Sequence, residues 1–167
     1  MPIVREPCDV GEICDAALEE MKSSHPDRAF RLVTSGELGG FFDRARLEQA
    51  FGNLLNNAVQ HGAPDSPVVL EAHGTPERIS VHVRNDGTPI PAAALQVIFN
   101  PLVRVPNASR AGDARSTSLG LGLFIARGIV QGHGGTLEVE SSEASGTVFT
   151  ARLPVCAGGR TESWPAC

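Results

Sequence analysis

Two asparagines four residues apart give residues 47–62 (LEQAFGNLLNNAVQHG) their potential for chemistry. The apolar residues of this stretch recur at the three- and four-residue spacing of a helix that packs on a core. Asn53 and Asn57 lie on the flank of that apolar stripe. Asparagine is a mediocre helix former, and a buried amide without partners costs about 1 to 3 kcal/mol. Something should therefore meet these amides, and neighbouring loops, water or a ligand all remain open at this point.

Three later segments carry further motifs. Residues 83–91 read VRNDGTPIP, a strand that ends in a polar turn containing glycine, and residues 98–104 read IFNPLVR. Residues 118–125 read SLGLGLFI, in which Gly120 and Gly122 open a helix that runs to about His133. A helix N-terminus presents free N–H groups, and glycine lets the backbone approach phosphate oxygens closely. A plain helix start would fit one glycine better than two.

In chain order, the four segments resemble the N, G1, F and G2 boxes of the ATP-binding domain of bacterial sensor histidine kinases. The resemblance covers roughly residues 9–154, and the N-x-G-x-P-I-P variant in the second segment is similar to that of bacteriophytochrome-type kinases. The wider family includes the gyrase, Hsp90 and MutL ATPases and shares the Bergerat fold. The resemblance implies that the chain binds ATP with Mg²⁺ and transfers the γ-phosphoryl group to a histidine.

The resemblance assigns roles to the polar residues of the first box. Asn57 matches the Mg²⁺ ligand, and Asn53 matches a residue that contacts the water shell of the metal or the phosphates. An amide oxygen suits Mg²⁺, which takes one or two protein oxygens and keeps several waters. Gln60 falls where relatives often carry lysine, so the phosphate cradle has one charge fewer. His61 falls where they often carry tyrosine, and we expect a helix-end surface histidine there rather than a phosphate contact.

Asn53 also bears on the type of reaction. In the hydrolysing relatives the matching position is a glutamate that activates water, and an amide cannot accept a proton in that role. An imidazole nitrogen already has a free lone pair near neutral pH and needs less help as a nucleophile. Asn53 therefore favours a histidine kinase over an ATPase.

The second box departs from the common D-x-G-x-G pattern, because Asn85 stands at the Asp position and the second glycine is absent. Asn85 can still accept the adenine amino proton through its oxygen, with Gly87 in the turn behind it. A plain Asn-Asp-Gly turn is the alternative. We expect Ile90 to pack against the base and Thr147 to support the Asn85 contact.

Residues 100–118 are polar, Arg-rich and without periodicity, which predicts a lid over the nucleotide. Phe99 is expected to anchor the base of this lid, and Arg104 matches the basic residue that reaches the γ-phosphate. Around the two glycines of the fourth box, the expected contacts are Ser118 and Leu119 on the lid side, Gly120 and Gly122 at the phosphates, and Leu121 and Leu123 on the hydrophobic side.

The remaining patterns predict an α+β fold, a two-layer α/β sandwich whose mixed, largely antiparallel sheet is covered on one face by three helices. Asp9 and Asp43 are expected to cap the first two helices. We expect the domain at 1–154 and a tail or linker at 155–167. The expected elements are helices from Asp9 to about 24, from Asp43 through 47–62, at 91–99 and from 120 to 133, and strands at 29–34, 40–42, 68–73, 78–85, 136–141 and 147–153.

Composition excludes several classes of protein. The net charge of -5 does not suggest nucleic-acid binding, and no apolar run approaches a membrane span. The start of the chain lacks an apolar signal region, so we expect a cytoplasmic domain without membrane contact. The 4 cysteines and 5 histidines have no metal-ligand spacing, which favours reduced thiols over a zinc site or disulfides.

None of the histidines is followed by an acidic residue, as the family's phosphoacceptor histidine usually is. The resemblance therefore implies a catalytic domain whose partner is a phosphoacceptor domain, in the same full-length protein or a partner chain, with a response regulator as the indirect partner. Two alternatives stay open. One is a non-catalytic nucleotide-sensing or protein-interaction module on this fold, and the other is a serine kinase of the anti-sigma type.

Overall fold

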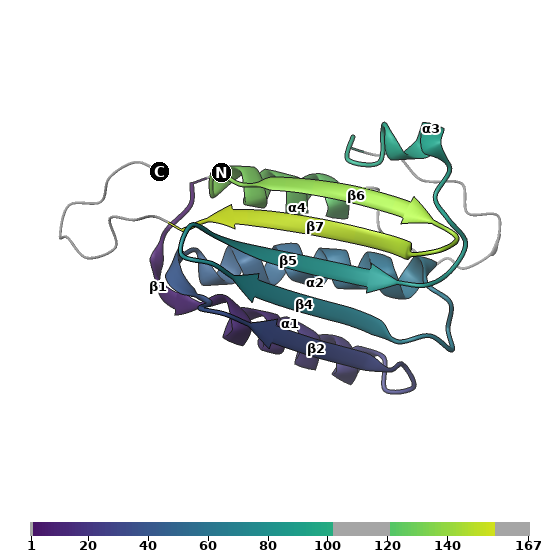
Figure 1. Cartoon of the computed structure of the whole chain (residues 1–167), viewed down its shortest axis with the longest axis horizontal. Coiled ribbons are helices and arrows are strands. Elements are labelled where there is room, and N and C mark those ends of the chain that lie inside the picture. Colours follow the sequence, from purple (N-terminus) through teal and green to yellow (C-terminus); the bar gives the residue numbers. More distant parts are fainter. Residues whose placement is uncertain (1, 102–120, 156–167) are drawn as a thin grey trace.

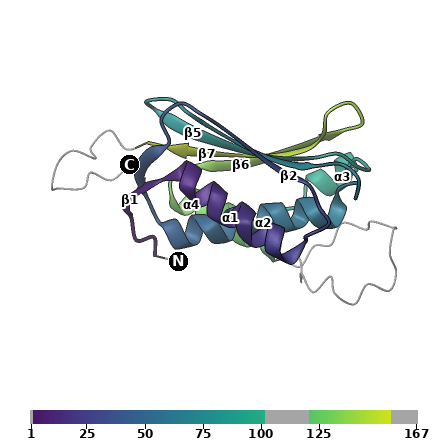
Figure 2. The same ribbon diagram turned by 90° about the horizontal axis from the view of Figure 1, so that it is seen from below.

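The computed structural model describes residues 2–101 and 121–155 as a two-layer arrangement of a sheet and helices. Helices α1 (Val10–Ser24), α2 (Arg44–His61) and α4 (Gly122–Gly132) cover one face of the sheet, and the short α3 (Ala92–Leu95) follows β5 (Figures 1 and 2). The strands are β1 (Glu6–Asp9), β2 (Phe30–Ser35), β3 (Gly39–Phe42), β4 (Val68–Gly74), β5 (Arg78–Asn85), β6 (Thr136–Ser142) and β7 (Gly146–Pro154).

The main sheet has the strand order β2-β4-β5-β7-β6. Only β2 and β4 pair in parallel, and the other neighbours are antiparallel. The fold predicted from the sequence, a mixed and largely antiparallel sheet with three helices on one face, is confirmed. A second, two-stranded sheet was not predicted: β1 pairs with β3, with Glu6 opposite Phe42. This small sheet fastens the start of the chain beside the start of α2.

The core lies between the helices and one face of the sheet. Alternate residues of β5, Ile79, Val81 and Val83, are fully buried, as the two-residue period of a strand requires. Burying an apolar side chain of this size contributes about 1.5 to 3 kcal/mol to stability. Each helix is therefore rotated about its axis so that its apolar residues face the core. In α2 this places the two asparagines at the edge of the core. The core residues of α2 are Leu47, Ala50, Phe51, Leu54, Leu55 and Ala58.

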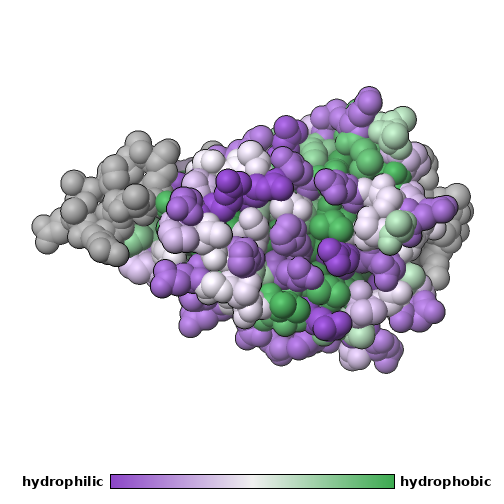
Figure 3. All heavy atoms as spheres, in the orientation of Figure 1, coloured by the Kyte–Doolittle hydropathy of each residue, from purple (hydrophilic) through white to green (hydrophobic). Residues whose placement is uncertain are grey.

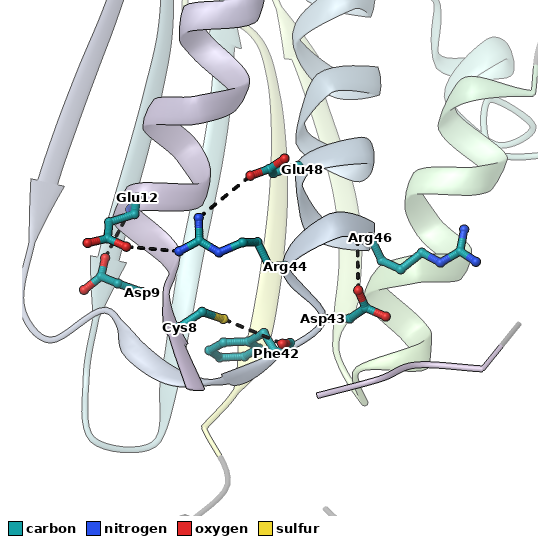
Figure 4. A network of polar contacts seen from close by, with 8 residues as sticks. All are labelled: Cys8, Asp9, Glu12, Phe42, Asp43, Arg44, Arg46 and Glu48. Carbon is teal, nitrogen blue, oxygen red and sulfur yellow. Dashed lines mark hydrogen bonds and ion pairs between the residues drawn. The ribbon is translucent and has the colours of Figure 1, made fainter. Parts of the chain in front are cut away.

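Both predicted helix caps are present. The Asp9 side chain accepts a hydrogen bond from the Glu12 N–H at 3.2 Å, and the Asp43 side chain accepts one from the Arg46 N–H at 3.1 Å. A cap of this kind stabilises a helix by about 1 kcal/mol. Arg44 links the first turns of two helices, because its guanidinium lies 3.0 Å from Glu12 on α1 (Figure 4).

Two of the four cysteines lie in the described part of the chain, and both are free thiols. Cys8 is half-buried and donates a weak hydrogen bond to the Phe42 carbonyl at 3.6 Å (Figure 4). Burial raises the pKa of the Cys14 thiol to about 12, so this thiol is not ionised near neutral pH. The other two, Cys156 and Cys167, lie outside the described residues.

The helix predicted at 91–99 is shorter than expected, and this prediction was wrong in its extent. The helix ends at Leu95, and the chain continues in turns. In these turns the N–H of Val97 donates to the Ala94 carbonyl, and the N–H of Asn100 donates to the Val97 carbonyl, each three residues back in the chain. Two β-branched residues, Val97 and Ile98, follow the alanines and favour helix less. Ile98 is buried, so packing decides the path of the chain here.

The sheet face away from the helices is mainly polar, with hydrophobic atoms gathered in a band that crosses the strands (Figure 3). Along β4 and β5, Glu71, His82 and Arg84 on this face alternate with buried neighbours. Within residues 2–101 and 121–155, no helix is both long and apolar enough to cross a membrane.

Candidate nucleotide site

The C-terminal half of α2 and the start of α4 meet in the structure. The side-chain amide of Asn53 donates a hydrogen bond from Nδ2 to the Gly122 carbonyl, at 3.1 Å. This bond joins the first and last of the four motifs, which are 69 residues apart in the chain. With its nitrogen engaged, the Asn53 amide presents its oxygen as the available acceptor. The helix predicted from 120 to 133 begins at Gly122 as α4, and Gly120 lies outside the described residues.

Asn57 lies one turn further along α2 and is half-buried. No other side chain or carbonyl of the described residues forms a hydrogen bond with its amide. Asn53 and Asn57 lie four residues apart and so on the same face of α2, and amide oxygens suit the hard, oxygen-preferring Mg²⁺, which needs one or two protein ligands. In the described part of the chain, no three His, Cys, Asp or Glu side chains gather as an alternative metal site.

Gln60 and His61 occupy the last turn of α2. Gln60 is exposed and His61 is half-buried, so His61 is less of a surface residue than expected. Burial lowers the pKa of the His61 imidazole, which is therefore neutral near pH 7. A neutral imidazole and a neutral amide bring no positive charge to this end of the helix.

Asn85 is the last residue of β5 and is buried, with only 4% of its surface exposed. Its Nδ2 makes a long hydrogen bond of 3.4 Å to the Asp86 carbonyl. The turn that follows packs tightly on the end of α2, because a Cβ atom at Gly87 would lie 2.9 Å from the His61 carbonyl oxygen. Gly87 also has a φ of +149°, which side chains disfavour. Position 87 therefore requires glycine, because of its positive φ and because a side chain would clash with the end of α2.

Ser141 is a site residue that the sequence reasoning missed. Its hydroxyl oxygen accepts a hydrogen bond from the Ile90 N–H at 2.8 Å and lies 2.7 Å from the Thr147 hydroxyl. Thr147 stands opposite both Asn85 and Ser141 in the sheet register, so it lies beside Asn85, but its hydroxyl pairs with Ser141. The antiparallel register of the predicted hairpin is the signal that could have identified Ser141.

Phe99 is held between an aromatic ring and a cation. Its ring makes an edge contact with Phe149, with centroids 6.2 Å apart and an interplanar angle of 79°. The Arg127 guanidinium lies 5.4 Å from the centroid of the Phe99 ring, a contact that the sequence did not predict. Phe99 is therefore anchored to the sheet and to α4 together.

Leu121 and Leu123 are half-buried, and Leu123 packs against the core, in agreement with the expected hydrophobic side of the motif. The predicted contacts Arg104, Ser118, Leu119 and Gly120, and most of the predicted lid at 100–118, lie outside the described residues.

A hollow of about 490 Å³ lies elsewhere, between the start of α1 and β2. None of the predicted nucleotide contacts lines it. Its lining residues include Glu12, Asp15, Thr34 and Leu38. Asp9 lines it as well, and three carboxylates make the hollow a poor match for a nucleotide phosphate.

Comparison with known proteins identifies the family. Residues 42–157 match the family described as histidine kinase-, DNA gyrase B-, and HSP90-like ATPase. The chain belongs to this family. The matched residues include the helix with both asparagines, the turn after β5 and the start of α4, which are the parts that the structure brings together.

Within the family, the similar proteins are sensor histidine kinases. The chain is 34% identical over 167 residues to the probable sensor histidine kinase TcrY of Mycobacterium tuberculosis, covering 98% of this chain and 34% of TcrY. It spans about a third or less of the length of the curated relatives it matches. The mycobacterial sensor histidine kinase MprB superimposes with a TM-score of 0.75 at 27% identity, covering 90% of this chain and 97% of that one.

The ATP-binding domain of PrrB from Mycobacterium tuberculosis gives a TM-score of 0.72 at 27% identity, covering 92% of this chain and 98% of that one. The similarity to sensor histidine kinase catalytic domains predicted from the four motifs is confirmed. The closer likeness to bacteriophytochrome-type kinases stays a prediction.

Proposed function

We propose that this chain binds Mg-ATP and transfers the γ-phosphoryl group to a histidine on a separate phosphoacceptor domain in two-component signalling. One observation carries the proposal: an amide, Asn53, occupies the position where a hydrolysing enzyme needs a carboxylate, and it is hydrogen-bonded to the backbone of α4. The family and the sensor kinases that this chain resembles support it.

In this proposal each motif has one task. Asn57 holds Mg²⁺ through its amide oxygen, and Asn53 contacts the water shell of the metal or the phosphates. The metal, when bound, neutralises phosphate charge. The N–H groups at the start of α4, with Gly122 first, meet the phosphates at the positive end of the helix dipole.

Residues at the end of β5 and in the turn after it bind the adenine base. Asn85 accepts the amino proton of adenine, Ile90 packs on the ring, and Ser141 holds the Ile90 backbone in place. Arg104, Ser118, Leu119 and Gly120 complete the proposed contacts to the phosphates and the lid. Thr147, Gln60 and His61 border the site.

The reaction is a displacement at phosphorus. The bond between the γ-phosphorus and the bridging oxygen breaks with ADP as the leaving group, and a bond forms between phosphorus and an imidazole nitrogen of the acceptor, which loses its proton to solvent. Phosphoryl transfer asks for positioning and charge neutralisation more than for covalent chemistry by the protein. Because the acceptor brings a lone pair of its own, no general base is needed at position 53.

The test combines the purified chain, ATP labelled in the γ-phosphate, and a helical hairpin that carries a histidine followed by glutamate or aspartate. We expect ATP binding, transfer of label to the hairpin, and slow hydrolysis in its absence. Rapid hydrolysis by the chain alone would indicate an ATPase.

Two further outcomes would support the alternatives. Label on a serine of a partner protein would indicate a serine kinase of the anti-sigma type, and nucleotide binding without transfer to any hairpin would indicate a nucleotide-sensing module. The domain limits 1–154, a tail or linker beyond them, a cytoplasmic location and an indirect response-regulator partner belong to the same proposal.

A further inference from the structure

Arg28 lies in the loop between α1 and β2, outside every segment that carries a nucleotide motif. Its guanidinium donates three hydrogen bonds to main-chain carbonyls. Nη2 reaches Ala63 at 2.8 Å, Nη1 reaches Val59 at 3.2 Å, and Nε reaches Ser66 at 3.4 Å. Val59 belongs to the last turn of α2, and the other two lie in the turn that leads to β4. One side chain thus holds the end of α2 and the loop after it together.

Arginine suits this task for a geometric reason. Its planar guanidinium has five N–H donors in a fixed fork, whereas the single ammonium of lysine cannot reach three separated carbonyls at once. Its charge also faces the C-terminal end of α2, where carbonyls without helical partners carry partial negative charge. The Arg28 side chain is half-buried, so water screens these contacts only in part.

The segment held by Arg28 lies directly against the proposed base reader. A Cβ atom at Gly62 would be 2.9 Å from Nη2 of Arg28 and 3.1 Å from Cβ of Asn85. The next residue, Ala63, donates its N–H to the Asp86 carbonyl at 2.6 Å. The guanidinium and the turn after β5 are therefore both packed against the backbone of residues 62–63.

We infer that Arg28 is a positioning residue of the nucleotide site, which sets the position of Asn85 relative to the helix that carries Asn57. The inference rests on the proposed function, because it assumes that one nucleotide spans both residues. Arg28 itself does not touch the nucleotide. A displacement of either half of the site by about 1 Å weakens binding of a ligand that needs both, while a ligand that uses one half is little affected.

The test compares Arg28→Lys and Arg28→Ala with Arg44→Ala as the matched control. Arg44 is the first residue of α2, and it forms ion pairs with Glu48 on the same helix and with Glu12 on α1, at the end of α2 away from Arg28 (Figure 4). For each variant, calorimetry with Mg²⁺ gives the dissociation constants of ATP and of inorganic tripolyphosphate, which lacks the base. Thermal unfolding in the same buffer monitors stability.

We expect both Arg28 variants to bind ATP about tenfold more weakly, as is usual for residues that orient a ligating group. Binding of tripolyphosphate should stay within about twofold of wild type, and Arg44→Ala should bind both ligands normally. Millimolar methylguanidinium should restore ATP binding to Arg28→Ala, because it can refill the space between the three carbonyls. It should have no effect on Arg44→Ala.

Several results would overturn the inference. They are ATP binding unchanged in Arg28→Lys, equal weakening of ATP and tripolyphosphate, or methylguanidinium that raises the melting temperature of Arg28→Ala without restoring ATP affinity. If Arg28→Ala does not fold, the dissociation constants of Arg28→Lys for ATP and for tripolyphosphate test the inference on their own. Failure of the wild-type chain to bind ATP would instead refute the proposed function.

Discussion

The two ends of α2 treat their polar groups in opposite ways. At the N-terminal end, Asp43 accepts hydrogen bonds from the N–H groups of Arg46 and Val4, and its own N–H donates to Nε2 of His133 at 3.0 Å. At the C-terminal end, Asn57 and Gln60 find no hydrogen-bond partner within the described residues. The N-terminal end is therefore closed, whereas the C-terminal end is open at these two amide side chains, although Arg28 holds the Val59 carbonyl there.

The closed end depends on one buried histidine. His133 is fully buried, and its Nδ1–H donates to the Ile129 carbonyl at 2.8 Å while its Nε2 accepts from Asp43. Both ring nitrogens are engaged in a single neutral tautomer. Satisfied polar groups of this kind stabilise a fold, whereas accessible amides on a rigid helix are available to a ligand. Polar groups at the closed end therefore serve structure, and under the proposed function the amides at the open end serve binding.

The largest expected effect is at the open end. Asn57→Ala should weaken Mg-ATP binding about a hundredfold, the upper range for a contact to a charged group, and should abolish its dependence on Mg²⁺. Calorimetry with a non-hydrolysable ATP analogue, with and without Mg²⁺, measures both. Asn56→Ala, one residue away on the exposed side of α2, is the control and should bind normally. Unchanged Mg²⁺ dependence in Asn57→Ala would remove Asn57 as the metal ligand.

At the closed end, His133→Phe should lower the free energy of unfolding by about 2 to 4 kcal/mol, because two hydrogen bonds are lost and a buried N–H of Asp43 is left without a partner. Chemical denaturation measures this change. ATP affinity at temperatures where the variant is folded should be that of wild type, and a large loss of affinity would mean that the two ends are not independent. His73→Ala, at an exposed histidine, should have little effect.

The same histidine makes stability depend on pH. Burial lowers the pKa of His133 below its ordinary value of 6.5, so on acidification the unfolded chain takes up a proton before the folded chain does. Stability should therefore be full above pH 6.5 and fall as the pH drops below it. Burial also lowers the pKa values of His61 and His82, which add to this slope. His133→Phe should show a shallower decline than wild type, and equal slopes would contradict the assignment.

A smaller effect concerns the choice of base. An aspartate at position 85 accepts the amino proton of adenine but repels the oxygen of guanine, whereas the amide of Asn85 can turn over and suit either base. Asn85→Asp should raise the preference for ATP over GTP by about 1 kcal/mol, or about fivefold. Dissociation constants for both nucleotides measure it, with Asp86→Asn as control. An unchanged ratio in Asn85→Asp, with loss of ATP binding in Asp86→Asn, would identify Asp86 as the base reader.

The smallest effect is expected at Ser141. Ser141→Ala removes the acceptor for the Ile90 N–H and the partner of the Thr147 hydroxyl, and should weaken ATP binding about threefold, less than one net hydrogen bond. Ser142→Ala, at the last residue of β6, where the hydroxyl contacts Ser145 in the turn, should bind ATP as wild type does. Equal affinities in the two variants would show that Ser141 serves the hairpin alone.

The sequence predicted the elements whose signals are local. Helix caps at Asp9 and Asp43 and the alternation of β4 and β5 identified those elements to within about two residues. Strand β1 was missed, because its four residues contain a proline and pair with a strand about thirty residues away. No local pattern reports such a pairing.

The candidate site divides in the same way. The motifs identified Asn53, Asn57 and Asn85, which can be read from type and spacing. Arg28 and Ser141 act through neighbours that are distant in the chain, so their importance appears only when the sheet register and the turns are known. Residues that hold a site in place carry a weaker sequence signal than residues that face the ligand.

The attachment of β1 to β3 has a mechanical consequence. Val4 is bonded to Asp43 and Glu6 is paired with Phe42, so the first described residues are fastened within a residue or two of the start of α2. A pull on the N-terminal end of this chain loads these bonds first, and beyond them the force passes to α1 along the chain and to the start of α2 through Asp43. The start of the chain and the asparagine-bearing helix are thus mechanically connected without passing through the main sheet.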